Sequence, residues 1–251
     1  MSGLIYQKEH RVKYYECDAT KQISIPMLLN IMLYVSGEQS YKLGVGDAIL
    51  LEKGLSWIIL QNDIHIQRLP EAGETITITT QALSYNKLFT YREFKAFDET
   101  GELCVQVHCT FALMDFAARK MARIAEDVVA PYQVEASKKL IRTPKPEKVD
   151  LEKAATIDYR VRYLDIDANQ HVNNSKYLDW FLDSLGLDFI KTHRIKSLNV
   201  KYEKEVAYGN MVQSKVSLST QEDGSIISAH QIVNHDVLSC EASMVWEPLN
   251  E

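Results

Sequence analysis

Apolar residues form two helix-like stretches, one in each half of the chain. From Met27 to Val35 almost every position is hydrophobic, so the predicted helix has almost no polar face and should be buried on most sides. Ser24 can cap this helix, and Pro26 is tolerated in its first turn because the missing N–H has no partner there. Gly37 marks its expected end.

The second stretch predicts an amphipathic helix rather than a uniformly apolar one. Asn173 or Asn174 can cap its start, and Gly186 is suited to end it. Its apolar stripe consists of Tyr177, Trp180, Phe181 and Leu185.

Alternating apolar and polar positions after each helix predict antiparallel strands. The first half contains such segments at 75–79, 88–97 and 104–114, with a hairpin turn at 98–101. The second half repeats the series at 211–219, 226–233 and 237–246, with a turn at 223–224. This order predicts an α+β fold in which an antiparallel sheet curls around a central helix.

The two halves are also related in sequence. Residues 12–23 align without a gap on residues 161–172, and further matches follow up to Trp246. Prolines and charged residues mark the join. We therefore predict a tandem duplication with an N-terminal domain at 1–130, a linker at 131–156 and a C-terminal domain at 157–251.

The copies differ at positions that bear chemistry. Asp18 corresponds to Asp167, but Thr20 and Gln22 stand where the second copy has Asn169 and His171. Leu69 likewise stands where the second copy has Glu205. Only the second copy therefore carries a complete set of polar groups, which predicts an active site there.

Composition and charge narrow the class of protein. The chain has 46% hydrophobic and 25% charged residues and a net charge of −6, which argues against nonspecific nucleic-acid binding. We expect no membrane span, because apolar runs of about 20 residues are missing. The N-terminal sequence lacks signal-peptide and transit-peptide features, so the expected location is cytoplasmic. The four scattered cysteines indicate reduced thiols, and the histidine spacing predicts no metal site.

Four residues are the candidate catalytic groups. In an extended segment, Asp167, Asn169 and His171 would share one face because side chains alternate with a period of two. Glu205 is the expected fourth member. A carboxylate, an amide and an imidazole can activate a water and donate to a developing oxyanion.

Each candidate also has a structural interpretation. Asp and Asn before a helix are common capping and turn residues, as Asn173 and Asn174 illustrate, and a single histidine is more often structural than catalytic. Glu205 can be an ordinary surface carboxylate. A calcium loop does not fit, because Gln170 and Lys176 stand where a glycine and a bidentate glutamate are required.

The segment from Asp165 to Tyr177 resembles the signature of acyl-acyl-carrier-protein thioesterases. It contains Asp-x-Asn-x-His-Val-Asn-Asn, and the segment 202–206 is similar to that family's Tyr-Arg-Arg-Glu-Cys segment. The resemblance, which includes the plant plastid members, implies a tandem double hotdog fold, with each half a long central helix wrapped by an antiparallel sheet. Val206 replaces the cysteine sometimes described as a nucleophile, so hydrolysis by an activated water is the better interpretation.

The resemblance further implies hydrolysis of acyl-[acyl-carrier-protein] to free fatty acid, with acyl carrier protein as partner and no cofactor. The alternatives to this expected function are an acyl-CoA thioesterase and a noncatalytic acyl-binding hotdog protein. The resemblance also implies that the N-terminal domain holds the acyl chain. The expected lining residues are Met32, Val35, Trp57 and Ile59, and the alternative for each is plain core packing. The expected carrier-protein contacts are Arg194, Lys196, Lys201 and Lys204, and the alternative for this cluster is an ordinary solvated surface. The sequence leaves homodimer formation, acyl chain length and the identity of the catalytic base open.

Overall fold

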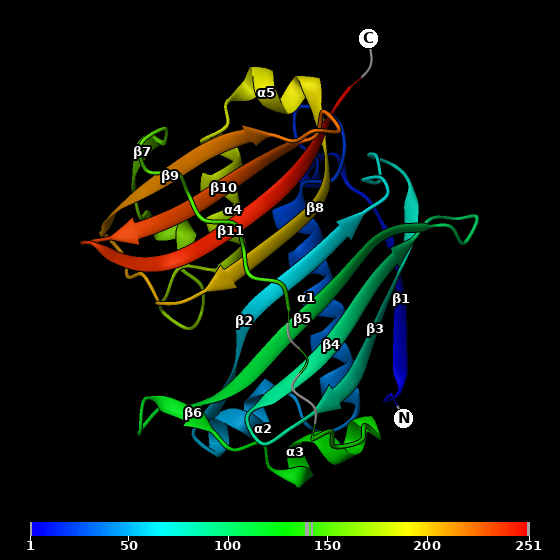
Figure 1. Cartoon of the computed structure of the whole chain (residues 1–251). Helices are drawn as coiled ribbons and strands as arrows, with labels where there is room; N and C mark the ends of the chain where they lie inside the picture. Colours follow the sequence, from blue (N-terminus) through cyan, green and yellow to red (C-terminus); the bar gives the residue numbers. More distant parts are fainter. Residues whose placement is uncertain (1, 139–140, 142, 250–251) are drawn as a thin grey trace. The chain divides into compact units, whose positions relative to one another are not determined.

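A computed structural model of the chain describes residues 2–138, 141 and 143–249 (Figure 1). The chain forms two compact units. The N-terminal unit comprises Met1–Asn62 and Gln67–Thr143, and the C-terminal unit comprises Asp63–Ile66 and Pro144–Glu251. Residues 139, 140 and 142 of the predicted linker lie outside the described residues. Strand pairing begins again at Ala155, within the range predicted as linker, and the predicted domain limits stay a prediction.

The N-terminal unit is a helix against an antiparallel sheet. Its elements are β1 (Ile5–Arg11), η1 (Tyr14–Glu16), α1 (Ile25–Lys42), α2 (Asp47–Glu52), β2 (Leu55–Ile66), β3 (Thr75–Tyr85), β4 (Phe89–Phe97), β5 (Leu103–Asp115), β6 (Lys120–Ala122), α3 (Glu126–Val129) and η2 (Ala130–Tyr132). The strand order is β1-β3-β4-β5-β2, and α1 packs on β1 and β3.

The C-terminal unit repeats this arrangement. Its elements are β7 (Ala155–Arg160), η3 (Tyr163–Asp165), α4 (Asn174–Asp183), α5 (Leu187–Thr192), β8 (His193–Tyr202), β9 (Met211–Thr220), β10 (Ile226–Asn234) and β11 (Val237–Pro248). The order β7-β9-β10-β11-β8 matches that of the first unit strand for strand, and α4 packs on β9 and β10. The predicted duplication and the predicted meanders are confirmed.

The helix starts agree with the sequence, whereas the helix ends do not. The Ser24 hydroxyl accepts the N–H of Met27 at 3.4 Å, and the Asn173 side chain accepts the N–H of Ser175 at 2.9 Å. However, α1 continues through Gly37 to Lys42. Glycine weakens a helix by only about 1 kcal/mol, and packing beyond it compensates, because buried Gln39 donates to the carbonyl of Leu4 at 2.9 Å.

The helix of the second unit is shorter than predicted. It ends at Asp183, before the predicted stop at Gly186, which instead precedes α5 with a φ of 82°. Helix α1 has 18 residues and α4 has 10, so the central helix of the second unit is the shorter one.

The core of the N-terminal unit contains a cation. Buried Arg92 on β4 donates from Nη1 to Gln39 Oε1 at 2.7 Å and to Thr80 Oγ1 at 2.9 Å. Its guanidinium also lies 5.0 Å from the ring centroid of Tyr132. Burial lowers the pKa of Arg92 below its usual range.

The core of the C-terminal unit contains a neutral polar cluster at the matching place. Ser228 on β10 pairs with Met244 as Arg92 pairs with Cys109. The Ser228 hydroxyl accepts the indole N–H of Trp246 at 2.8 Å and lies 2.8 Å from His230 Nε2. Burial lowers the pKa of His230 to about 3, so the imidazole is neutral in the folded protein.

Among the described residues, no helix is both long and apolar enough to cross a membrane.

Candidate active site

The predicted catalytic segment is a tight turn, which corrects the expectation of an extended strand. Ile166 and Val172 form an isolated antiparallel bridge, and the N–H of Asp167 donates to the carbonyl of His171 at 3.0 Å. Gln170 takes a left-handed conformation with a φ of 67°. Chain reversal removes the period of two, so side-chain alternation does not align Asp167, Asn169 and His171 on one face.

Asp167 holds this turn together. Its Oδ1 accepts the backbone N–H of Asn169 at 2.8 Å, and the carbonyl of Asp167 accepts the N–H of Gln170 at 3.0 Å. Asn169 lies exposed at the tip of the turn. This is the local hydrogen bonding for which Asp is favoured in turns.

His171 and Glu205 are brought together as the sequence predicted. The His171 Nε2 lies 3.1 Å from Glu205 Oε2, and the side chains are 40% and 49% exposed. The contact follows from the backbone, because the N–H of Val172 donates to the carbonyl of Val206 at 3.1 Å. His171 directly precedes Val172 and Glu205 directly precedes Val206, so this backbone bond brings the two side chains together. The pair is open to water.

The base of the turn is anchored by a buried acid. Asp165 is fully buried and accepts the backbone N–H of Arg162 at 2.7 Å and an Arg162 guanidinium N–H at 2.8 Å. These bonds with Arg162 lower the pKa of Asp165 against the opposing effect of burial. Sequence reasoning gave Asp165 no role in the site. The signal was present in the repeat, since Glu16 accepts the N–H of Lys13 in the same way at 2.9 Å.

Tyr177 is a second residue that sequence reasoning left in the core rather than at the site. Burial raises the pKa of its phenol above the usual range, and the negative charge of Glu205 acts in the same direction. The Tyr177 ring packs edge-on against Tyr202 at 5.7 Å. The phenol of Tyr177 therefore stays neutral, at a distance from which the charge of Glu205 still acts on it.

The N-terminal unit contains the same turn with different side chains. Cys17 and Ile23 form the bridge, Lys21 has a φ of 66°, and the N–H of Ile23 donates to the carbonyl of Pro70 at 2.8 Å. Asp18 accepts the N–H of Thr20 at 2.8 Å, as Asp167 accepts that of Asn169. The predicted correspondence of Leu69 with Glu205 follows from the matching bonds at Pro70 and Val206.

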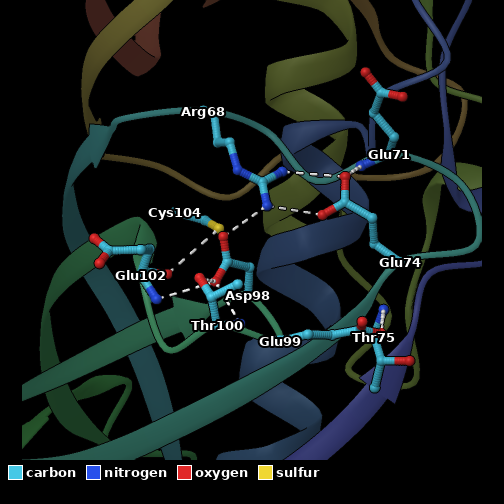
Figure 2. Close-up of polar contacts among 9 residues, drawn as sticks. All are labelled: Arg68, Glu71, Glu74, Thr75, Asp98, Glu99, Thr100, Glu102 and Cys104. Atoms are coloured by element: carbon cyan, nitrogen blue, oxygen red, sulfur yellow. Dashed lines mark hydrogen bonds and ion pairs between the residues drawn. The ribbon is translucent and has the colours of Figure 1, made fainter.

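The loop that carries Leu69 is fixed by ion pairs (Figure 2). Arg68 Nη1 and Nη2 donate to the two oxygens of Glu74 at 3.1 and 2.8 Å, and Nη2 also donates to Asp98 at 3.0 Å. The guanidinium lowers the pKa of Glu74, and bonds from Thr100 and Arg68 lower that of Asp98. At the matching places the second unit has Lys204 and Asn210, so its Glu205 loop lacks the chemistry for this bidentate pair.

The cysteines are poorly suited to nucleophilic chemistry. Cys240 is the cysteine of the C-terminal unit, and burial raises its pKa well above the usual value. Burial also raises the pKa of Cys104, Cys109 and Cys17. A thiol must ionise to attack. Val206 is fully buried next to Glu205.

An open depression adjoins the turn on the C-terminal unit. Its volume is about 620 Å³, and it is lined by Tyr163, Leu164, Ile166, Asp167, Ala168, Gln170 and Tyr208. Both the turn and the loop after Glu205 contribute to its walls.

The residues predicted to bind the acyl chain lie in the N-terminal unit. Met32 and Val35 are buried on the same side of α1, one turn apart. Trp57 and Ile59 are half-buried on β2, and Trp57 packs against the cluster of Leu50 and Leu113.

The residues predicted to bind the carrier protein do not form one cluster. Arg194 and Lys196 lie at the start of β8, and Lys201 lies at its end, so the strand separates Arg194 from Lys201 by roughly 20 Å. Arg194 pairs with Glu247 at 2.7 Å, Lys196 with the same carboxylate at 3.9 Å, and Lys201 with Glu203. Only Lys201 and Lys204 lie close to Glu205 along the chain.

Comparison with known proteins agrees with this architecture. Residues 3–132 match the acyl-ACP thioesterase N-terminal domain, and residues 148–248 match the acyl-ACP thioesterase C-terminal domain. The chain belongs to the acyl-ACP thioesterase family.

Curated plant proteins are among the relatives. The chain is 25% identical over 234 residues to a chloroplastic acyl-[acyl-carrier-protein] hydrolase, FATB3, of Cuphea viscosissima, covering 88% of this chain and 57% of that protein. It is 24% identical over 246 residues to a chloroplastic palmitoyl-acyl carrier protein thioesterase of Arabidopsis thaliana, covering 92% and 59%. The chain thus spans less than two thirds of the length of these relatives.

Solved structures confirm the α+β double hotdog fold. A Lactobacillus plantarum protein provisionally named an oleoyl thioesterase superposes with a TM-score of 0.95 at 34% identity, covering 99% of this chain and 98% of that one. A 12:0-ACP thioesterase from Umbellularia californica superposes with a TM-score of 0.85 at 21% identity, covering 99% of both chains.

Proposed function

We propose that the protein hydrolyses the thioester of acyl-[acyl-carrier-protein] and releases free fatty acid and the carrier's thiol. The observation that carries this proposal is the His171–Glu205 pair, because an imidazole held by a carboxylate is suited to take a proton from water. Membership of the family and the acyl-carrier-protein substrates named for its plant members support the same reaction.

The proposed chemistry needs one water molecule and no covalent acyl-enzyme. A proton on Nε2 of His171, directed at Glu205, leaves Nδ1 as the basic nitrogen. His171 then takes a proton from water while the oxygen attacks the carbonyl carbon. The tetrahedral intermediate collapses with cleavage of the C–S bond, and the proton passes to the departing thiolate.

Glu205 and Asp167 have separate tasks in this proposal. Glu205 stabilises the imidazolium formed during attack, whereas Asp167 positions the turn through its bond to the N–H of Asn169. Asp18 makes the same bond in the unit that lacks His171, which favours a positioning role for Asp167. Asn169, exposed at the turn tip, is the proposed donor to the carbonyl oxygen.

We propose that the N-terminal unit holds the acyl chain, with Met32, Val35, Trp57 and Ile59 as lining residues. Carrier protein is the proposed partner and the cytoplasm the proposed location. The ion pairs of Arg194, Lys196 and Lys201 reduce the charge available to attract an acidic carrier, so the proposed carrier contact there is weak. Hydrolysis of acyl-CoA is the alternative, since the same residues serve both thioesters.

A panel of acyl-carrier-protein and acyl-CoA thioesters with matched acyl groups tests this function. Release of free thiol should be measured at subsaturating substrate, and kcat/KM should be higher for the carrier-protein thioesters. A higher value for acyl-CoA would support the alternative. Acyl binding without thiol release by the folded protein would show a noncatalytic acyl-binding protein.

A further inference from the structure

Large side chains around the depression beside the turn are exposed to solvent. Tyr163 and Leu164 are each 79% exposed and Tyr208 is 57% exposed. Two aromatic rings and a leucine exposed around one hollow offer a ligand apolar contact surface together with hydroxyl groups. The volume of about 620 Å³ is in the range of sites for small molecules or flexible segments.

The location of the depression connects it to the chemistry. Asp167 and Gln170 form part of its wall, and the same turn carries His171. A ligand that fills the depression therefore has one end beside the turn and the other end at the open rim.

A cation lies beside the rim on the side of Tyr208. The guanidinium of Arg160 stacks over the Tyr208 ring at 5.5 Å from its centroid. Arg160 is exposed, and it forms no ion pair with the other residues that the structure describes. Arg162 differs, because it is paired with Asp165. A stacked, unpaired guanidinium is well suited to bind a phosphate.

We propose that the depression binds the phosphopantetheine arm of the substrate, a deepening that rests on the proposed thioester hydrolysis. Tyr163, Leu164 and Tyr208 contact the apolar groups of the arm. Arg160 binds the phosphate at its outer end. The arm is common to acyl-carrier-protein and acyl-CoA, so this site recognises the chemistry that both share and leaves their discrimination to other surfaces.

Four thioesters with one acyl group test this assignment: acyl-pantetheine, acyl-phosphopantetheine, acyl-CoA and acyl-carrier-protein. Arg160→Ala should raise KM about tenfold for the three substrates that carry the phosphate, and leave acyl-pantetheine unchanged. Tyr208→Ala should raise KM for all four. In both variants kcat should stay near the wild-type value, because the reacting atoms keep their contacts.

Tyr14 provides a matched control. It is 82% exposed and occupies the position of Tyr163 in the repeat, so Tyr14→Ala should leave all four KM values unchanged. An equal rise of KM in Tyr14→Ala and Tyr163→Ala would overturn the proposal. So would an Arg160→Ala effect confined to acyl-CoA, which indicates recognition of the nucleotide, or confined to acyl-carrier-protein, which indicates recognition of the carrier's surface.

A binding measurement separates this proposal from the proposed function. If the wild-type protein hydrolyses none of the four thioesters, the hydrolytic function fails, and calorimetric titration with phosphopantetheine still tests the site. The proposed site is supported if the wild-type protein binds phosphopantetheine and Arg160→Ala binds it about tenfold more weakly. No binding, or equal binding by both proteins, overturns it.

Discussion

The turns at 17–23 and 166–172 share their main backbone hydrogen bonds, but they differ in the side chains that could take part in catalysis. Both contain a left-handed residue, an aspartate that accepts the N–H two residues later, and a bond to a neighbouring loop. Only the second places an imidazole 3.1 Å from a carboxylate. What the copies share is therefore the architecture of the turn, and what distinguishes them is the candidate chemistry.

The cores of the two units differ in a similar way. Arg92 and Ser228 occupy matching places on β4 and β10, but one unit buries a cation and the other a neutral cluster with His230. In the first unit, a buried hydrogen bond joins Arg92 to Gln39 of α1. The second joins neighbouring strands through Ser228 instead.

The largest expected effect comes from the pair that only the second turn contains. His171→Ala and Glu205→Gln should each lower kcat about a hundredfold to ten-thousandfold, because general-base help of this size is lost. Thiol release and thermal unfolding should be measured together. Gln22→Ala, at the place of His171 in the first copy, is the control and should leave kcat unchanged. Near-normal rates in both active-turn variants of the folded protein would remove the site from this turn.

The next effect concerns the buried cluster of the C-terminal unit. The pKa of His230 is about 3 when folded and near 6.5 when unfolded, so between these values the unfolded state binds more protons. Stability is therefore lost as the pH falls below about 6.5, by up to about 1.4 kcal/mol per pH unit from this group. His230→Phe, which places the residue found at Phe94 in the first copy, should remove that share of the slope. Urea unfolding from pH 4.5 to 7.5 measures it, and identical slopes for both proteins would contradict the assignment.

A smaller effect should come from the two turn aspartates, at least as large for Asp18 as for Asp167 because Asp18 also accepts the Thr20 hydroxyl. Asp18→Ala and Asp167→Ala should each lower the free energy of unfolding by about 1 kcal/mol, the usual size for loss of such a side-chain acceptor. Denaturant unfolding compares them directly. Only Asp167→Ala should also lower kcat, because only that turn positions His171. Loss of turnover in a stable Asp18→Ala protein would show that the first turn takes part in the reaction.

The smallest expected effect is that of removing the thiol from the C-terminal unit. Cys240→Ala should retain wild-type kcat, since burial keeps this thiol protonated and water is the proposed nucleophile. Steady-state thiol release and mass spectrometry of quenched reactions are the measurements. An inactive but folded Cys240→Ala protein, or an acyl group trapped on the wild-type cysteine, would contradict hydrolysis by water.

The sequence predicted those parts of the molecule that local rules control. Ser24 and Asn173 cap their helices because the side-chain oxygen is next to the unpaired N–H, and the meanders follow from alternation. The correspondence of Leu69 with Glu205 was also correct. Gly73 and Gly209 follow these residues at the same spacing, and their N–H groups donate to the matching carbonyls of Val12 and Val161. Glu205 was predicted to join His171 because it lies at a strand end before the Gly209 turn, and not because of spacing along one strand.

The failures lie where distant contacts override local preference. Gly37 does not end α1, since Gln39 beyond it bonds Leu4 and Arg92. The left-handed Gln170 turns the catalytic segment back on itself, and neither its residue type nor its spacing indicates this conformation. The depression near Tyr208 depends on two loops that are far apart in the sequence, so its shape could not be read from either one.

Most bonds that hold the two turns come from the backbone; the side chains that take part are the turn aspartate and the buried acid of each copy, and in the first copy the Thr20 hydroxyl, which donates to Asp18. A turn of this kind is insensitive to most of its own side chains, so mutations at Gln22 and Leu69 carry little risk of unfolding. After a duplication, such positions in one copy can drift while the other copy is kept under selection. For protein engineering the same property makes the N-terminal turn a spare scaffold, into which a second set of functional groups can be introduced without redesigning the fold.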